Sequence, residues 1–387
     1  MAGPLLPYGR QTIEDDDIAA VAQALRGDFL TTGPLVDAFE AAFADKVGAR
    51  HAVACSNGTA ALHLAMLALE VQPGEVCIAP SITFLATANC ARYVGAEVVF
   101  ADVDPLTGLM TPDTLAEAIS RVGDRRLRAV LPVHLRGDTA ELPALAALAA
   151  DAGAVLVEDA PHALGSTMSF GNTRERVGDA RHSAMATFSF HPVKTIATGE
   201  GGMVTTNDDR LAQRLKTLRS HGMVRPDGAD PWIYEMPEPG FNYRLPDILC
   251  ALGLSQLAKL DRFAARRRAL AARYAEALKP LAPVVRPAVR PDWSDPVLHL
   301  MVALIDFAAA GKTRRQVVDE LRARGVGTQV HYIPVHTQPY YRDRHGPLAL
   351  PGAEEWYRTC LSLPLYPGMA DEDVDRVILA LSGVLGL

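Results

Sequence analysis

Residues 51–80 read HAVACSNGTAALHLAMLALEVQPGEVCIAP and decide the fold, because two short apolar runs flank one helical stretch. Three similar runs follow, and the candidate strands are HAVAC (51–55), EVCIAP (75–80), EVVFADVD (97–104), RAVLPVHL (128–135) and AVLVED (154–159). Strands that alternate with helical stretches indicate a parallel sheet with helices on both faces. The runs are apolar throughout rather than alternating, as expected of strands that are covered on both sides. The sequence therefore predicts an α/β fold.

Two further strand candidates, AMATFSF (184–190) and MVTTN (203–207), extend this series. Too few residues separate them for a helical crossover, so we expect an antiparallel pair. The predicted sheet of the large domain then has seven strands, most of them parallel. Ahead of the sheet, 14–26 and 35–47 show the periodicity of amphipathic helices.

A smaller α/β domain is predicted at the C-terminal end. One long helix is expected over 246–276, and the proline-rich stretch 279–296 leads into the small domain. We place the large domain, with its N-terminal arm, at 1–256 and the small domain at 257–387. Within the small domain the patterns predict two strands and two helices, at 299–307, 325–334, 313–325 and 371–385.

Composition excludes several classes of function. The net charge of −7 gives no electrostatic reason to expect nucleic acid as a partner. The five cysteines show no CxxC spacing, so neither a disulfide framework nor a zinc site is expected, and we assign no metal ligands. The N-terminus does not read as a signal peptide, and no apolar run reaches the roughly 18–20 residues of a membrane span. The cytoplasm is the expected compartment.

Two charged residues follow apolar strands, at the edge of the sheet where α/β proteins bind ligands. Asp159 ends the run AVLVED, and a buried carboxylate there needs a cationic partner such as a protonated pyridine nitrogen. Helix capping by Asp159 is the alternative. Lys194 lies in TFSFHPVKTIATGEGG (187–202), where a depressed pKa would make it a nucleophilic amine. A solvated loop lysine is the alternative, and in isolation the more common one.

Two other stretches add a phosphate site and an aromatic plate. In SNGTAALHLA (56–65) a helix begins near Thr59, and the backbone N–H groups of a helix start bind anions. Ser189 could donate to the same phosphate. Phe84, just past the second strand, could stack on a planar cofactor. Alone, these features fit an ordinary strand-to-helix turn and a core phenylalanine equally well.

The combination is more specific than its parts. A phosphate cradle, an aromatic plate, an acid for a ring nitrogen and an amine for a Schiff base are what pyridoxal 5'-phosphate requires. Lys194 would hold the cofactor and, once displaced by the amino donor, would move the proton as general base and acid.

These motifs resemble the DegT/StrS family of sugar aminotransferases, which have the aspartate-aminotransferase fold (fold type I). The resemblance covers nearly the whole chain. It rests on LTTGP (30–34), SNGTAALHLA (56–65), PSITFLATAN (80–89), VEDAPHALGS (157–166), FSFHPVKTIATGEGG (188–202), LRSHG (218–222), GFNYRLPDILCALGLSQL (240–257), HYIPVHTQPYY (331–341) and LSLPLYPGM (361–369). The resemblance implies a large domain with a seven-stranded, mostly parallel sheet and a smaller C-terminal α/β domain.

The family's site residues map onto this chain at matching motif positions. Lys194 matches the Schiff-base lysine, Asp159 the acid at the pyridine nitrogen, His162 a polar residue near the ring, and Phe84 the stacking aromatic. The phosphate site is matched by Gly58, Thr59, Ala60 and Ser189.

Four further residues match the family's motifs. Asn242 matches an asparagine that reaches the cofactor phosphate of the partner subunit, which implies a homodimer with shared active sites. Thr31, Tyr332 and His336 fall in segments that line the sugar pocket. Without the resemblance, GFNYRLPD would fit a turn before a helix, and the histidines of HYIPVHTQ would fit an edge strand on the surface.

The resemblance also narrows the reaction. Pro161 replaces the alanine that is usual in the family, and this leaves Asp159 in place. Relatives with histidine at the lysine position are dehydratases, so Lys194 favours transamination. The motifs are most similar to the branch that aminates C4 of UDP-linked 4-keto-6-deoxy-N-acetylhexosamines with L-glutamate, for pseudaminic acid biosynthesis. The alternatives are UDP-4-keto-arabinose, a GDP-perosamine precursor, a dTDP-3-keto sugar, or a non-catalytic regulator that binds pyridoxal phosphate.

Overall fold

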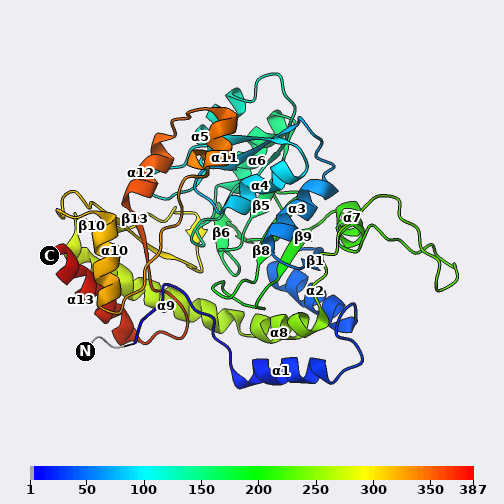
Figure 1. Ribbon diagram of the computed structural model, residues 1–387, viewed down its shortest axis with the longest axis horizontal. Coiled ribbons are helices and arrows are strands. Elements are labelled where there is room, and N and C mark those ends of the chain that lie inside the picture. The colour runs from blue at the N-terminus through cyan, green and yellow to red at the C-terminus, as the bar shows by residue number, and fades with distance from the viewer. Residues whose placement is uncertain (1–3) are drawn as a thin grey trace.

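The computed structural model describes residues 4–387 (Figure 1). Its helices are α1 (Asp15–Leu25), α2 (Pro34–Val47), α3 (Gly58–Ala68), α4 (Leu85–Tyr93), α5 (Pro112–Ser120), α6 (Leu142–Asp151), α7 (Asp209–Arg219), α8 (Asp247–Ala258), α9 (Leu260–Leu278), α10 (Arg314–Ala323), α11 (Pro339–His345), α12 (Pro351–Thr359) and α13 (Asp371–Leu385). Its strands are β1 (His51–Cys55), β2 (Val76–Pro80), β3 (Glu97–Ala101), β4 (Leu127–Val130), β5 (Val155–Asp159), β6 (Thr167–Phe170), β7 (Thr173–Arg176), β8 (Met185–Ser189), β9 (Gly202–Thr206), β10 (Val285–Pro287), β11 (Ser294–Asp295), β12 (Met301–Ile305) and β13 (Cys360–Leu363).

A seven-stranded sheet in the order β1-β9-β8-β5-β4-β2-β3 forms the centre of the larger part of the chain. The pairs from β8 through β3 are parallel, and β9 runs antiparallel to both of its neighbours, β8 and β1. The predicted fold class, the seven strands and the antiparallel pair are therefore confirmed.

Helices cover both faces of this sheet, which explains why its strands are apolar throughout. On one face α3 and α4 contribute small and aliphatic side chains to a continuous core. On the other face α2, α5, α6 and α8 form a second core. In that second core Phe43 of α2 packs against Phe188 and Phe190, with ring centroids 5.1 and 5.6 Å apart.

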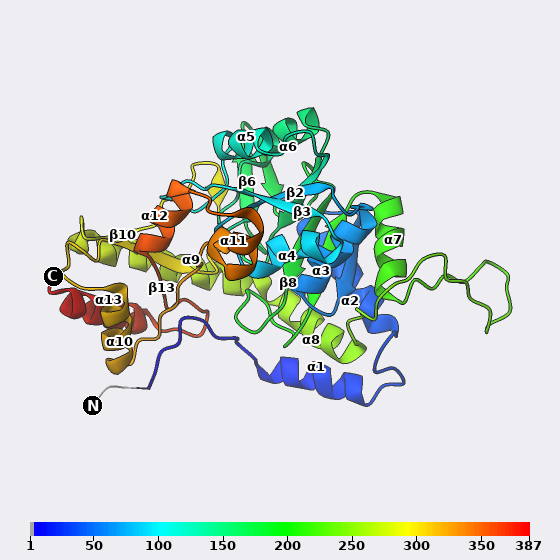
Figure 2. The same cartoon turned by 45° about the horizontal axis from the view of Figure 1, so that its top comes forward.

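The C-terminal part has a core of its own. The antiparallel sheet β10-β12-β13 packs with α9, α10 and α13 around buried residues such as Leu270, Val317 and Leu381. A third small sheet, β11-β6-β7, joins the two parts of the chain, since β11 of the C-terminal part pairs with β6 of the larger part. Figure 2 shows α9 running from the large sheet to the C-terminal helices.

Two predicted elements differ from the structure. The long helix expected over 246–276 is two helices, because the chain turns at Lys259, whose N–H bonds to the carbonyls of Gln256 and Leu257. The prediction of a strand over 325–334 is wrong, since only isolated bridges form there. Backbone groups near this segment pair elsewhere: the N–H of Gly327 donates to Leu6, and that of Val335 donates to Ser81.

The N-terminal arm contacts the C-terminal part rather than the large sheet alone. Leu6 exchanges backbone hydrogen bonds with Gly325 and Gly327, and its side chain belongs to the C-terminal core. The domain limit at 256/257 stays a prediction. Within the described residues no helix is long and apolar enough to cross a membrane.

Candidate active site

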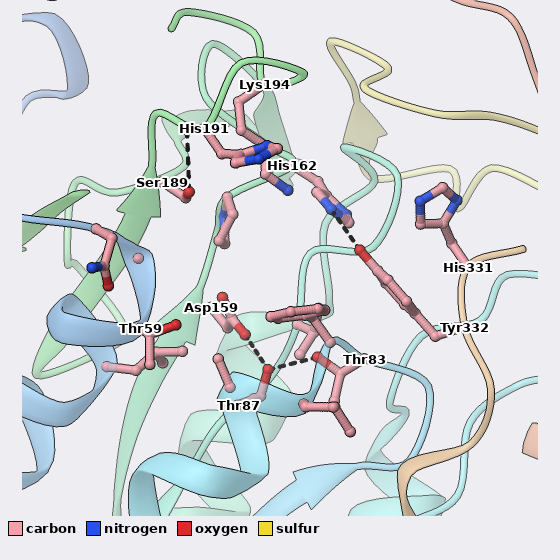
Figure 3. A pocket seen from close by; sticks show the side chains of 18 of the residues that line it. Thr59, Thr83, Thr87, Asp159, His162, Ser189, His191, Lys194, His331 and Tyr332 are labelled. Atoms are coloured by element: carbon pink, nitrogen blue, oxygen red, sulfur yellow. Dashed lines mark hydrogen bonds between the residues drawn. The ribbon is translucent and has the colours of Figure 1, made fainter. Parts of the chain in front are cut away.

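A cavity of about 1070 Å³ opens at the carboxyl edge of the large sheet. Asp159 is the last residue of β5 and Ser189 the last residue of β8, so adjacent strands deliver both side chains to this edge. Lys194 follows β8 in the loop to β9, and Phe84 precedes α4. All four residues line the cavity, together with His162 and Tyr332 (Figure 3).

One end of the cavity is formed by the start of α3. Asn57 caps this helix, and its side-chain oxygen accepts the N–H of Ala60 at 2.8 Å. The amides of Gly58 and Thr59 lie ahead of the first intrahelical bond, where a helix start offers free donors to an anion. The hydroxyls of Thr59 and Ser189 line the same end. This end therefore suits a phosphate, with the Ala60 amide already engaged.

Gly58 keeps this end open. A Cβ atom there would come within 2.8 Å of Cβ of Ser189, closer than real side chains approach. The missing side chain lets the end of β8 pack directly on the start of α3.

Asp159 lies deep in the cavity and accepts a hydrogen bond from the hydroxyl of Thr87. Burial raises the pKa of this carboxyl, while the Thr87 hydrogen bond and the positive charges of Lys194 and His134 lower it. A carboxylate in this position is a strong site for a cationic ring nitrogen.

Lys194 faces the same cavity from the loop between β8 and β9. Burial lowers the pKa of its ammonium group to about 8, against the opposing effect of the Asp159 charge. A lysine with this pKa holds a useful fraction of neutral, nucleophilic amine near neutral pH. Gly199, at φ +87°, turns the loop back into β9.

A group of aromatic side chains forms the wall opposite the sheet. The ring of Tyr332 lies 6.2 Å from that of Phe84 and nearly parallel to that of His162. The hydroxyl of Tyr332 lies 3.2 Å from Nε2 of His162. His299 stands 4.5 Å from His162, ring centroid to ring centroid. Phe84 is 58% exposed in the single chain, so its ring is free to cover a planar group.

The histidines of this wall are held neutral. Burial lowers the pKa of His331 to about 3, and the pKa values of His162 and His299 also fall well below the usual range. Nδ1 of His162 and Nδ1 of His299 are buried without a hydrogen-bond partner among residues 4–387. Buried polar atoms without partners are uncommon, and here they line a ligand cavity.

Three predicted residues do not line this cavity. Thr31 and Asn242 are exposed on the single chain. His336 is buried beside the cavity, where its Nδ1 lies 2.6 Å from the hydroxyl of Ser81. Their predicted roles are untested by this placement, since Asn242 was expected to act in a partner subunit.

Sequence reasoning missed other lining residues, above all Thr83, Thr87 and His299. Thr83 and Thr87 flank Phe84 in the motif TFLAT, and their spacing of four residues places both on one side of a helix start. That spacing was a usable signal. His299 precedes a strand in the C-terminal part, and nothing local to its sequence indicates a site.

Comparisons with known proteins agree with this geometry. A model of the DegT/DnrJ/EryC1/StrS aminotransferase family matches residues 11–382. The chain belongs to this family. The recognition made from the motifs is thus confirmed, and this member of the DegT/StrS family is a sugar aminotransferase, a pyridoxal-phosphate-dependent transaminase by family.

Relatives in the DegT/StrS family align from end to end. The spore coat polysaccharide biosynthesis protein SpsC of Bacillus subtilis (strain 168) is 39% identical over 388 residues, which is 98% of this chain and 97% of SpsC. The structure of PseC from Helicobacter pylori, an aminotransferase involved in the biosynthesis of pseudoaminic acid, has a TM-score of 0.89 at 28% identity and covers 99% of both chains. S. venezuelae DesV, solved with a ketimine intermediate, has a TM-score of 0.87 at 33% identity over 100% of both chains.

Proposed function

We propose that this aminotransferase converts a UDP-linked 4-keto-6-deoxy-N-acetylhexosamine into its 4-amino sugar, a precursor of pseudaminic acid, with L-glutamate as the amino donor. The observation that carries the proposal is the presence of Lys194 and Asp159 in one cavity of a chain similar to PseC from end to end. The cavity volume of about 1070 Å³ is ample for a cofactor together with a sugar.

The residues present fit pyridoxal 5'-phosphate. Gly58, Thr59 and Ser189 would hold its phosphate, Phe84 would cover its ring, and Asp159 would pair with its ring nitrogen. Gly58 supports this fit, since a Cβ atom would fill the close contact with Ser189. When bound, the cofactor supplies an electron-accepting ring that stabilises negative charge on the substrate carbon.

Lys194 carries the proton transfers in this proposal. Its amine is partly neutral near pH 8, so it accepts a proton from the substrate carbon and returns it as an acid. Asp159 stays an anion and holds the positive charge of the ring nitrogen in place. Phe84 and Tyr332 cover the reacting region and exclude water.

We also propose that the enzyme is a homodimer in which a second copy of the chain completes the cavity. The lining of the cavity includes Lys194 and no arginine among the described residues, although glutamate and the sugar diphosphate bring several negative charges. Asn242 and the loop after α7 lie on the outside, and Figure 2 shows that loop extending away from the body. The loop exposes Trp232 (72%) and Tyr234 (60%), as expected of residues that a partner copy covers.

A panel of keto sugars tests the substrate. The purified protein, loaded with pyridoxal phosphate and supplied with L-glutamate, is offered UDP-, GDP- and dTDP-linked keto sugars. We expect amination of the UDP-linked 4-keto-6-deoxy-N-acetylhexosamine, detected as the amino sugar and 2-oxoglutarate. Turnover with UDP-4-keto-arabinose, a GDP-linked or a dTDP-linked sugar alone would reject this substrate and keep the aminotransferase.

A further inference from the structure

Two threonines form a chain of hydrogen bonds that ends on Asp159. The hydroxyl of Thr83 lies 2.6 Å from that of Thr87, and the hydroxyl of Thr87 bonds Oδ2 of Asp159. All three residues are at least 95% buried, although each lines the cavity. Figure 3 shows the dashed lines running from Asp159 through Thr87 to Thr83.

The direction of this chain follows from counting protons. An ionised carboxylate only accepts hydrogen bonds, and each hydroxyl has one proton to donate. Thr87 therefore donates to Asp159, and its oxygen is left to accept the proton of Thr83. The arrangement favours the anion, since a hydrogen bond to a charged carboxylate oxygen is stronger than one to a neutral carboxyl group.

The start of α4 places the two hydroxyls. Phe84 is the N-cap residue of α4 and makes no side-chain capping bond, and the N–H of Thr87 donates to its carbonyl. This turn points the ring of Phe84 at the open cavity and the hydroxyls of Thr83 and Thr87 at the end of β5. Neither hydroxyl is used to cap the helix, so their pairing with Asp159 needs another explanation.

We propose that Thr87, oriented by Thr83, is the positioning residue that keeps Asp159 ionised and turns its other oxygen, Oδ1, toward the ring nitrogen of the cofactor. The inference rests on the proposed function and names a residue that acts through Asp159 rather than on the substrate. No hydrogen bond within the described residues occupies Oδ1, which leaves it for a ligand.

The charges around Asp159 favour this role. Burial alone raises the pKa of the carboxyl, and the Thr87 hydrogen bond is the largest opposing effect. The other ionisable groups that face it come from four segments: Lys194 after β8, His134 after β4, Cys90 of α4 and Tyr332 of the aromatic wall. Lys194 and His134 favour the anion, whereas Cys90 and Tyr332 carry no charge at neutral pH.

The test compares binding of two cofactors to the apoprotein, pyridoxal phosphate and its 1-deaza analogue, in which carbon replaces the ring nitrogen. Thr87→Val removes the hydroxyl at nearly constant volume, and Thr87→Ser keeps it. Thr359→Val is the matched control, because Thr359 is a buried threonine that bonds only backbone oxygens on α12. The readout is the ratio of the two dissociation constants between pH 5 and 9.

Wild-type protein, Thr87→Ser and Thr359→Val should all prefer pyridoxal phosphate to the analogue. Thr87→Val should lose about tenfold of this preference at neutral pH, since a hydrogen bond to a charged group has that worth. As the pH is lowered, Thr87→Val should lose the preference at a pH about one unit higher than the wild type does, because Asp159 without the Thr87 hydroxyl takes up a proton more readily. If Thr87→Val weakened the binding of both cofactors equally, the ratio would stay at the wild-type value, and the substitution would only have loosened the site.

Three results overturn the proposal: a wild-type ratio in Thr87→Val, a lost preference in Thr87→Ser, or no preference in wild type. If Thr87→Val does not fold, Thr83→Val carries the test, and it should lose a smaller part of the preference. Failure of wild-type protein to bind pyridoxal phosphate at all is a separate result, which would reject the proposed function instead.

Discussion

Lys194 lies in an environment that an ordinary, solvated lysine does not have. Lysine in water has a pKa near 10.4, whereas burial lowers that of Lys194 to about 8. At pH 7 the neutral fraction is then on the order of 100-fold larger than for an exposed lysine. The charge of Asp159 limits the shift and keeps the two groups coupled across the cavity.

The pH dependence of cofactor capture follows from this pKa. Apoprotein mixed with pyridoxal phosphate should react at a rate that rises about tenfold per pH unit and levels off above about pH 8, because the protonated amine does not attack. Stopped-flow absorbance of the violet band measures this rate. A rate that keeps rising to pH 10 would contradict the lowered pKa of Lys194. Lys194→Ala should give no such band.

Among the elements, the apolar strands were the most predictable. β1, β2, β3, β4 and β5 were identified by uninterrupted apolar runs, since both faces of the sheet are covered. The break between α8 and α9 was not predictable from periodicity, because the apolar pattern continues through Lys259 while tertiary ion pairs with α1 hold its side chain. The segment 325–334 has strand-like composition, yet it forms only single bridges, to Leu6 of the N-terminal arm and to Ser362 of β13.

The site residues also divide into those that the sequence predicts and those that only the fold brings to the cavity. Asp159 ends a strand, and Lys194 and Phe84 lie in the loops just after strands, so the position of an edge residue in an α/β sheet was enough to propose them. Thr87 could have been proposed from its spacing to Thr83, whereas His299 reaches the cavity only through the packing of the C-terminal part, which no local pattern reports. Tyr332 was proposed from a motif, while its hydrogen bond to His162 required the fold.

The start of α3 gives a prediction at the scale of an element. Gly58→Ala places a Cβ atom 2.8 Å from that of Ser189 and should push the helix start away from β8. We expect the affinity for pyridoxal phosphate to fall at least about tenfold, because the loss of one charge-assisted hydrogen bond has that effect. Affinity for pyridoxal, which lacks the phosphate, should change little.

Gly368→Ala is the matched control for Gly58→Ala. Its added Cβ would meet only ordinary contacts near 3.8 Å, and its φ is not positive. This variant should bind both ligands as the wild type does. An equal loss of pyridoxal and pyridoxal phosphate binding in Gly58→Ala would contradict a phosphate site at the start of α3.

For the whole molecule, the open question is how the cavity is completed. Asn242 and Trp232 lie on the outside of the single chain, in or beside the loop that follows α7. If a second copy brings Asn242 to the cofactor phosphate, two damaged chains should complement each other. A mixture of Lys194→Ala and Asn242→Asp then contains mixed dimers with one intact site.

Equal mixing should restore roughly a quarter of the wild-type activity, since half of the dimers are mixed and each has one intact site of two. Each variant alone should be nearly inactive. Sedimentation at matched concentration should show a dimer for all three samples. No gain on mixing, with mixed dimers present, would place Asn242 in the same chain's site or in none.

The most direct measurement of the central claim is absorbance during a half-reaction. The purified protein loaded with pyridoxal phosphate should show a violet band that L-glutamate bleaches and that the UDP-linked 4-keto-6-deoxy-N-acetylhexosamine restores, with release of the 4-amino sugar. Lys194→Ala should show neither change. A protein that takes up no cofactor, or a Lys194→Ala variant that completes both half-reactions, would contradict the role of Lys194 in this cavity.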